Sequence, residues 1–438
     1  MGKRQIKLWS LVFMILLACL PGLVSCGGDK DGEKDKIDYL VFQDPSFQFQ
    51  LVRAIGATLS YGADIMECLS TAYAITEGDF ESWYEEWHKT AERVHNIADE
   101  ALARGHKVSA YQAYLRATTY YRCAEFFLHG NPDDPRILAT WGASRECFRQ
   151  AAPLLPTPVE VVEIPYENTT LPGYFLQVDD SGVARPTVIV NTGFDGTGEE
   201  LYFGAAAFAL QRGYNCLIFE GPGQGSVVRV QKLYFRPDWE KVVTPVVDYA
   251  LTRPEIEPSR IALIGLSFGG YLAPRAACYE HRIAACIADG GVFDAFMGAM
   301  GGPVSRDEVI EYIEEAPEDF NEEIMKDAES DTGLIWAIDN GMFAFGASSP
   351  AEWILKTADY TLEGIADGIS CPLLVIQSAD DPNFPGQAQK LYDAVTCPKT
   401  YMLFTEEEGA QYHCQMGALA IFSQKVFDWL DETFASLP

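Results

Sequence analysis

The spacing of apolar residues changes character about one third of the way along the chain. Between Phe47 and Ala152, apolar side chains recur every three or four positions, which is the period of a helix with one buried face. The clearest run starts after Asp79, a suitable N-cap, and ends at Gly105; its members are Trp83, Trp87, Ala91, Val94 and Ala98. This pattern predicts a helical domain over residues 45–152.

Two more helices are predicted in the same domain. Residues 109–128 form a second apolar run, and Asp134-Pro135 has the residue types of an N-cap followed by a first helical position. The runs share no repeat period, so we interpret the segment as a small helical domain and not as a repeat array.

From Pro153 onward, short β-branched runs alternate with helical segments, which is typical of a mainly parallel sheet. Residues 159–164 and 173–178 are expected to form an opening antiparallel pair. Six further runs are apolar enough to be buried strands, at residues 187–190, 215–219, 261–264, 283–287, 373–376 and 400–404. Residues 153–438 are therefore predicted to be one α/β domain whose central sheet is flanked by helices.

A long segment, residues 293–369, separates the fourth of these six runs from the fifth. It is rich in acidic and aromatic residues, among them Trp336, Phe343, Phe345 and Trp353. We expect a helical insertion that caps the α/β domain. Its aromatic residues suit a flat ligand, although core packing accounts for them equally well.

The first residues have the pattern of an export signal. Lys3, Arg4 and Lys7 precede an apolar run too short to favour a membrane-spanning helix, and Leu23-Val24-Ser25-Cys26 resembles the lipobox of bacterial lipoproteins. We predict a signal peptide over residues 1–25, lipid attachment at Cys26 and a polar tether over residues 26–44. The protein would then be an exported bacterial lipoprotein, anchored to a membrane and facing the periplasm or the cell exterior. The alternative is an ordinary secretory signal cut near the same place.

Charge and cysteine content limit the partners of the chain. The formal net charge is −31, which repels polyanions, so a nucleic-acid partner is not expected. Eleven cysteines occur, and nine remain after Cys19 in the signal and Cys26 are set aside. Their spacing fits no metal site, and buried free thiols are the interpretation we favour for most of them.

The sequence Gly265-Leu266-Ser267-Phe268-Gly269 follows a predicted strand and precedes a helical segment. This is the strand–turn–helix context that a G-x-S-x-G nucleophile elbow requires, and it is typical of the α/β-hydrolase fold. Flanking glycines allow the tight turn that exposes the serine hydroxyl. Ser267 is therefore the predicted nucleophile.

A serine hydroxyl needs a general base and an acid that orients that base. Of six histidines, only His413 follows the last predicted strand, where this fold places the base; four others lie in the helical domain, where surface or packing roles are the default. The acid is expected after the preceding strand, which offers Asp380 and Asp381. The pattern Asp-x-x-apolar-Pro found in this fold favours Asp381.

Several motifs together resemble one branch of the α/β hydrolases. They are the elbow and the segments Gly193-Phe194-Asp195-Gly196-Thr197-Gly198-Glu199-Glu200, Phe219-Glu220-Gly221-Pro222-Gly223-Gln224-Gly225 and Arg236-Pro237-Asp238-Trp239-Glu240. The branch includes 2,6-dihydropseudooxynicotine hydrolases, fungal polyketide-shortening hydrolases and FrsA-like esterases, and the likeness covers most of residues 155–435. It implies a homodimer, an active site between the core and a helical cap, and cleavage of a carbon–carbon bond beside a ketone.

The resemblance also suggests the groups that assist the triad. The oxyanion donors would be the backbone amides of Phe268, after the nucleophile, and of Phe194, in the loop after the third strand. An extra glutamate is expected to assist the serine. Thr197 and Glu200 have the spacing of a capping box, which would leave Glu199 as the freer carboxylate; a solvated acid at the start of a helix is the other interpretation.

The sequence thus predicts an exported serine hydrolase that transfers an acyl group from a small-molecule carbonyl substrate to water. No metal or organic cofactor is implied. An exported esterase or peptidase of the same fold is one alternative. The other is a lipid-anchored binding protein without catalytic activity, which is disfavoured because every triad position is filled.

Overall fold

The computed structural model describes residues 40–300 and 305–437. The predicted signal peptide, Cys26 and most of the predicted tether lie outside these residues. Within the described ranges, no helix is both long and apolar enough to cross a membrane.

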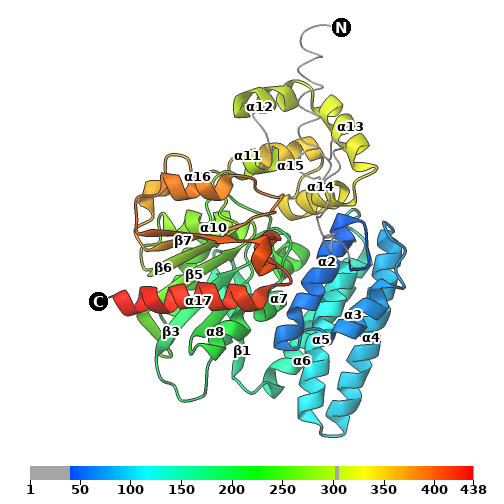
Figure 1. Cartoon of the computed structure of the whole chain (residues 1–438), viewed down its shortest axis with the longest axis vertical. Coiled ribbons are helices and arrows are strands. Elements are labelled where there is room, and N and C mark those ends of the chain that lie inside the picture. The colour runs from blue at the N-terminus through cyan, green and yellow to red at the C-terminus, as the bar shows by residue number, and fades with distance from the viewer. Residues whose placement is uncertain (1–39, 301–304, 438) are drawn as a thin grey trace, which may run out of the picture.

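The N-terminal part is a bundle of helices, drawn in blue and cyan in Figure 1. Its helices are α2 (Pro45–Gly56), α3 (Ile65–Ala72), α4 (Phe80–Ala103), α5 (Lys107–Glu125) and α6 (Pro135–Ala151). Asp79 and Asp134 accept hydrogen bonds from the first amides of α4 and α6, as the N-cap residue types predict. The apolar stripe of α4, including Trp83 and Trp87, is fully buried. The predicted second helix ends earlier than expected, at Glu125.

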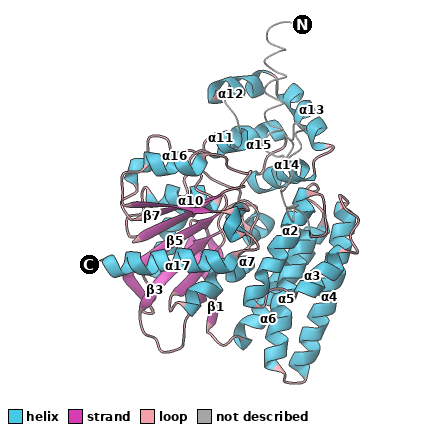
Figure 2. Cartoon of the chain, viewed as in Figure 1, coloured by secondary structure: helices cyan, strands magenta, loops and turns pink. Residues whose placement is uncertain are grey.

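A single eight-stranded sheet forms the centre of the rest of the chain (Figure 2). The strands are β1 (Val159–Tyr166), β2 (Thr169–Leu176), β3 (Arg185–Asn191), β4 (Asn215–Phe219), β5 (Ile256–Leu266), β6 (Ala285–Asp289), β7 (Leu373–Ser378) and β8 (Lys399–Phe404). Their spatial order is β1-β2-β4-β3-β5-β6-β7-β8. β1 and β2 are antiparallel, as predicted, β2 is antiparallel to β4, and the remaining neighbours are parallel.

Alternate side chains of the parallel strands pack into two separate cores. Val188 and Val190 of β3 face the core that continues into the helical bundle and α17 (Leu419–Ser436). Ile189 faces the opposite core, with α9 (Glu240–Ala250) and α10 (Gly269–Ala277). The sheet is covered on both faces, which explains why its strands read as continuous apolar runs. Three shorter helices, α7 (Gly198–Leu201), α8 (Ala207–Gln211) and α16 (Gln387–Ala394), complete this part.

The predicted insertion is helical and lies between β6 and β7. It contains α11 (Ala295–Met300), α12 (Arg306–Glu315), α13 (Pro317–Ala328), α14 (Thr332–Phe345) and α15 (Pro350–Thr357). These helices, yellow in Figure 1, lie above the end of the N-terminal bundle. Thr332 Oγ1 donates a 2.6 Å hydrogen bond to Asp44 at the start of α2. The insertion and the bundle therefore touch each other as well as the sheet.

Candidate active site

Ser267 occupies the sharp turn between β5 and α10. Its backbone has φ = 61°, a left-handed conformation that is strained for a residue with a side chain. A Cβ atom at Gly265 would lie 1.9 Å from the carbonyl oxygen of Gly269, so only glycine fits there. The turn has the geometry of a nucleophile elbow and presents the serine hydroxyl at the carboxyl end of the parallel strands.

His413 and Asp381 lie next to Ser267 in the arrangement predicted from the sequence. His413 Nε2 is 2.8 Å from Ser267 Oγ, and His413 Nδ1 is 2.6 Å from Asp381 Oδ2. These residues come from the loops after β5, β7 and β8, whose carboxyl ends meet at one edge of the sheet. The side chain of Asp380 is exposed, and the backbone amide of this residue donates a hydrogen bond to the carbonyl oxygen of Gln411. The geometry selects Asp381 over Asp380.

The surroundings of His413 favour its protonated form. Burial lowers its pKa, but the adjacent Asp381 carboxylate and the Cys414 thiol together raise the pKa of His413 well above its ordinary value. The side chains of His413 and Asp381 are only 11% and 3% exposed, so the pair is shielded from water. A base that binds its proton more tightly is half-titrated at a higher pH.

Hydrogen bonds anchor the loop that carries His413 to a second acid, Asp289, which was not predicted from the sequence. Cys414 and Gln415 both have positive φ angles, of 51° and 50°. Gln415 Nε2 donates to Asp289 Oδ1 at 3.2 Å and to Ser378 Oγ at 2.8 Å. Asp289, at the end of β6, is buried, and burial raises its pKa to about 6. A carboxylate at the end of a strand is a signal that sequence reasoning could have used.

The two predicted oxyanion donors lie on neighbouring segments. Gly193 packs so tightly on the elbow that a Cβ atom there would be 2.8 Å from both Phe268 N and Ser267 Cβ. Among the described residues, neither the Phe194 nor the Phe268 amide donates a hydrogen bond to another group of the chain. Both amides are therefore free to bind an oxyanion formed next to Ser267.

The predicted capping box is wrong. Thr197 precedes α7, but its side chain makes no capping bond, and Glu200 binds Arg53 of α2 through two hydrogen bonds of 2.6 Å. Because Arg53 offers two charge-assisted bonds, it outcompetes the backbone amides for this carboxylate.

Glu199 is not a solvated acid, and its carboxylate is only half free, because among the described residues Oε2 has no hydrogen-bond partner. It is 2% exposed, and its Oε1 accepts a 2.6 Å bond from Tyr174 on β2. β2 and β4 lie beyond β3 as seen from β5, so this contact holds Glu199 on the far side of β3 from Ser267. Among the described residues, Glu199 makes its hydrogen bond to Tyr174 and none to a triad residue.

Charged residues from the helical bundle meet the loop after β3 beside the triad. Besides its bonds to Glu200, Arg53 donates to Asp195 at 2.6 Å, and Arg122 of α5 donates to the same oxygen at 3.1 Å. Burial opposes ionisation of Asp195, but Arg53 and Arg122 hold its pKa below the ordinary value. Two arginines thus face two carboxylates, and the local charge is balanced. These arginines carried no recognisable signal in the sequence.

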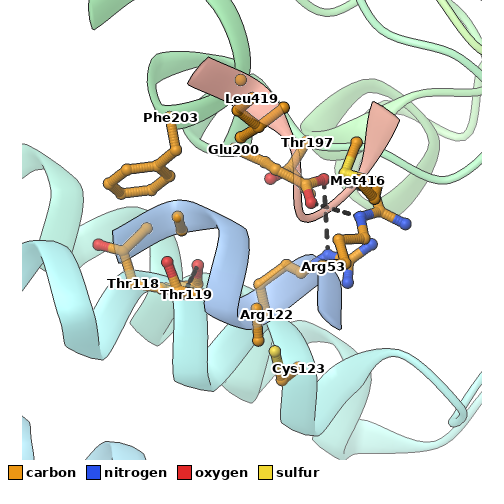
Figure 3. A pocket seen from close by; sticks show the side chains of 14 residues that line it. Arg53, Thr118, Thr119, Arg122, Cys123, Thr197, Glu200, Phe203, Met416 and Leu419 are labelled. Carbon is orange, nitrogen blue, oxygen red and sulfur yellow. Dashed lines mark hydrogen bonds and ion pairs between the residues drawn. The ribbon is translucent and has the colours of Figure 1, made fainter. Parts of the chain in front are cut away.

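A pocket opens where these groups meet the loop of His413 (Figure 3). Arg53 and Arg122 line it from the bundle, Thr197 and Glu200 from the segment after β3, and Met416 from the loop after His413. The lining therefore combines the bundle with the α/β domain, but it includes none of Ser267, Asp381 and His413, so this pocket is not formed by the triad itself.

Aromatic rings surround the imidazole. The rings of Phe49 and Phe384 lie 6.4 and 6.2 Å from that of His413. Phe194 packs edge-on against Trp336 of the insertion, which stacks on Phe126 at 4.7 Å. Trp83 and Trp87 do not contribute to these surroundings, because they are fully buried within the bundle, as their place in the apolar run predicts.

The remaining histidines and the cysteines complete the inventory. His129 is buried in the helical domain, which fits the packing role and not the surface role of the two expected there. The nine cysteines of the described ranges are free thiols, and all but Cys397 are buried. Across the same ranges no group of three or more His, Cys, Asp or Glu side chains is arranged to hold a metal ion.

Comparison with known proteins identifies relatives along most of the chain. Residues 66–301 match the family model "Esterase FrsA-like", and residues 188–416 match that of the alpha/beta hydrolase family. A hydrolase of a Fusarium species is 36% identical over 416 residues, which cover 90% of this chain and 98% of the relative. The 20-hydroxy-prefusarin hydrolase of Gibberella moniliformis is 37% identical over 422 residues, with coverage of 90% and 98%.

A solved structure supports the same fold. The 2,6-dihydroxy-pseudo-oxynicotine hydrolase aligns with a TM-score of 0.68 over 86% of this chain and 94% of that chain, at 22% sequence identity. The predicted resemblance and the predicted fold are both confirmed.

Proposed function

Because the chain belongs to the FrsA-like esterase family of α/β hydrolases, we propose that it is a serine hydrolase with Ser267 as nucleophile, His413 as general base and Asp381 as the orienting acid. The observation that carries the proposal is the unbroken chain of contacts from Asp381 through His413 to Ser267, with distances of 2.6 and 2.8 Å. A binding protein on a hydrolase scaffold would have no need of this alignment.

The mechanism follows from these contacts. Ser267 Oγ bonds to the carbonyl carbon of the substrate while its proton moves to His413 Nε2, and Asp381 keeps the second imidazole proton on Nδ1. The amides of Phe194 and Phe268 bind the oxyanion. The bond to the leaving group then breaks, and that group takes the proton from His413. Water, deprotonated by His413, attacks the acyl-enzyme, releases the acid and restores Ser267.

The proposed substrate is a small, largely apolar carbonyl compound. The aromatic rings around His413 favour an apolar body, and the balance of two arginines against two carboxylates gives no preference for a charged group. A relative named as a 20-hydroxy-prefusarin hydrolase supports a small-molecule substrate.

The leaving group is either an alkoxide, in an ester, or the carbon atom of an enolate, in a ketone beside a second carbonyl. The same triad serves both because His413 supplies the proton in each case. Turnover of an aryl ester and of an aryl β-diketone, measured side by side, identifies the bond. Brisk ester hydrolysis without any diketone cleavage would establish the esterase alternative.

The catalytic proposal is tested by labelling with a fluorophosphonate probe. Wild-type protein should be labelled at Ser267, and Ser267→Ala should not be labelled although it folds normally. Absence of labelling in a folded wild-type protein would refute the proposal.

We further propose export, lipid attachment at Cys26 and a homodimer; light scattering of the purified protein tests the dimer.

Glu199 has a structural role in this proposal. Its hydrogen bond from Tyr174 and its burial beside Glu220 link α7 to β2 and β4. Glu220 in turn accepts the amides of Gly198 and Ser226, at 2.7 and 2.8 Å. These carboxylates brace the segment after β3 from the side away from the triad.

A further inference from the structure

Two buried amide side chains hold the backbone on both sides of the Phe194 N–H group. Gln224 Nε2 donates to the carbonyl oxygens of Thr192 and Gly193, at 2.8 and 3.3 Å. Asn340 Nδ2 donates to the carbonyl oxygen of Phe194 at 3.1 Å. Each of the two amide residues is only 2% exposed. The peptide groups before and after Phe194 are therefore both anchored.

Anchoring these carbonyls sets the direction of the oxyanion donor. A peptide group is planar and trans, so the Gly193 carbonyl and the Phe194 N–H point in opposite directions. Gln224 holds that carbonyl, and the N–H must then point away from Gln224. A hydrogen-bond donor stabilises a developing charge best when its direction is fixed before the reaction.

Each amide side chain is itself oriented by a further contact. The Gly221 amide donates to Gln224 Oε1 at 3.0 Å. Asn340 Oδ1 lies 2.8 Å from His129 Nδ1. Because the Asn340 nitrogen is committed to Phe194, its oxygen is the acceptor, and His129 Nδ1 is the donor.

The chain of contacts continues into a buried ion pair. His129 Nε2 is 2.8 Å from Glu125 Oε1, and Arg229 Nη2 is 2.7 Å from the same oxygen. The side chains of Arg229 and Glu125 are 3% and 5% exposed. A buried pair of this kind keeps its geometry because separation would leave an uncompensated charge.

The network spans three parts of the molecule. Glu125 and His129 come from the helical domain, Asn340 from α14 of the insertion, and Gln224 and Arg229 from the segment after β4. Gln224 and Asn340 bond directly to a loop that packs against Ser267, and His129, Glu125 and Arg229 are linked to that loop through Asn340.

We infer that Gln224 and Asn340 are positioning residues that aim the Phe194 amide at the oxyanion, and that the oxyanion hole is complete only when the insertion and the helical domain are both docked. This inference rests on the proposed serine mechanism. Neither residue contacts the reacting atoms; each acts through the Phe194 backbone.

The test uses isosteric variants that replace the donor amide by a carboxyl group, and the control carries the same change at a residue whose donor is not used. Asn340→Asp keeps the acceptor that faces His129 but loses the hydrogen bond to Phe194. Gln224→Glu keeps the acceptor of the Gly221 amide and loses both donated bonds. Asn321→Asp is the matched control, because Asn321 lies in the same insertion and uses only its oxygen, as acceptor of the Ala351 amide at 2.8 Å.

We expect Asn340→Asp and Gln224→Glu to lower kcat about tenfold to a hundredfold with little change in KM, less than the loss on deleting an oxyanion donor outright. An aryl trifluoromethyl ketone, whose adduct with Ser267 carries the oxyanion, should bind more weakly by the same factor. Asn321→Asp should match wild type in both measurements. A merely structural role would lower the melting temperature without this paired loss.

Unchanged kcat in a folded Asn340→Asp protein would overturn the inference. If this variant fails to fold, Asn340→Ala, which adds no charge, is measured in its place, and unchanged kcat there has the same meaning. Fluorophosphonate labelling of wild type separates the two proposals. Missing label at Ser267 refutes the serine mechanism, whereas normal labelling with unaffected variants refutes only the positioning role.

Discussion

Arg53 on α2 binds Glu200 on α7 through two parallel hydrogen bonds, from Nε and Nη2, each 2.6 Å long. Its third nitrogen donates to Asp195 at 2.6 Å. Arg53 thus links the helical bundle to the segment that follows Phe194, the proposed oxyanion donor. Fork geometry of this kind is available to arginine but not to lysine.

We therefore expect Arg53→Met to destabilise the protein by about 2–3 kcal/mol, somewhat less than for a fully buried pair, since Glu200 is partly exposed. Arg53→Lys should recover part of the loss, because the charge returns without the fork. Urea unfolding measures both. Stabilities of both variants equal to wild type would show that the pair contributes nothing to docking.

The assignment of the acid can be tested by comparing two neighbouring aspartates. Asp381→Asn should lose activity on an aryl ester by several orders of magnitude, as should Ser267→Ala and His413→Ala, since triad members act as a unit (about three orders or more). Asp380→Asn should remain active because Asp380 is exposed. Steady-state kinetics on the aryl ester measure the activity of each variant. If Asp380→Asn loses activity while Asp381→Asn remains active, Asp380 is the orienting acid.

The pH dependence of the reaction should reflect the environment of His413. Burial opposes protonation of this residue, but Asp381 and Cys414 together raise its pKa above the ordinary value. Since the base must be neutral, kcat/KM should fall on the acidic side with a midpoint above about 6.5, the ordinary value for histidine. Asp381→Asn should move the midpoint to lower pH while it lowers the plateau. The prediction fails if the two profiles have the same acidic midpoint.

Stability should depend on pH through Asp289. Burial raises the folded-state pKa of Asp289 to about 6, above the unfolded value of about 3.9. Its contribution to stability is therefore complete below about pH 4 and is lost as the pH rises from about 4 to 6, a change of about 3 kcal/mol.

Asp289→Asn removes this titration. The free energy of unfolding of the variant, relative to wild type, should rise by about that amount between pH 4 and pH 7. Urea unfolding at several pH values measures the difference, in which the contributions of other groups cancel. A difference that does not vary with pH would mean that the pKa of Asp289 is the same in the folded and unfolded states and is not raised by burial.

The lipobox-like tetrapeptide predicts a lipid anchor. Expressed in a bacterial host with labelled fatty acid, wild type should incorporate label and enter the detergent phase, and Cys26→Ser should do neither. Cys397→Ser serves as a control, because Cys397 is the most accessible of the nine described thiols and should not affect labelling. A mature N-terminus at any residue other than Cys26 would exclude lipidation there.

Local features of this protein could be predicted from the order of its residues alone. Helix caps at Asp79 and Asp134 were predictable because a cap depends on residues within one turn. The elbow around Ser267 was predictable for the same reason, since glycines adjacent in sequence make the turn possible. The order of the predicted strands placed His413 after the last of them. The pattern Asp-x-x-apolar-Pro, which fits Asp381 but is shifted by one residue for Asp380, selected the acid.

Only the tertiary structure decided which polar groups meet across the molecule. Successive residues of a helix point about 100° apart, so a one-residue step sends Glu199 to Tyr174 and Glu200 to Arg53. Arg53 precedes Glu200 by 147 residues, and Phe194 precedes Asn340 by 146. No local pattern encodes such pairs. They form because the helical domain and the insertion dock on the same edge of the sheet, where buried polar groups must find partners wherever the fold supplies them.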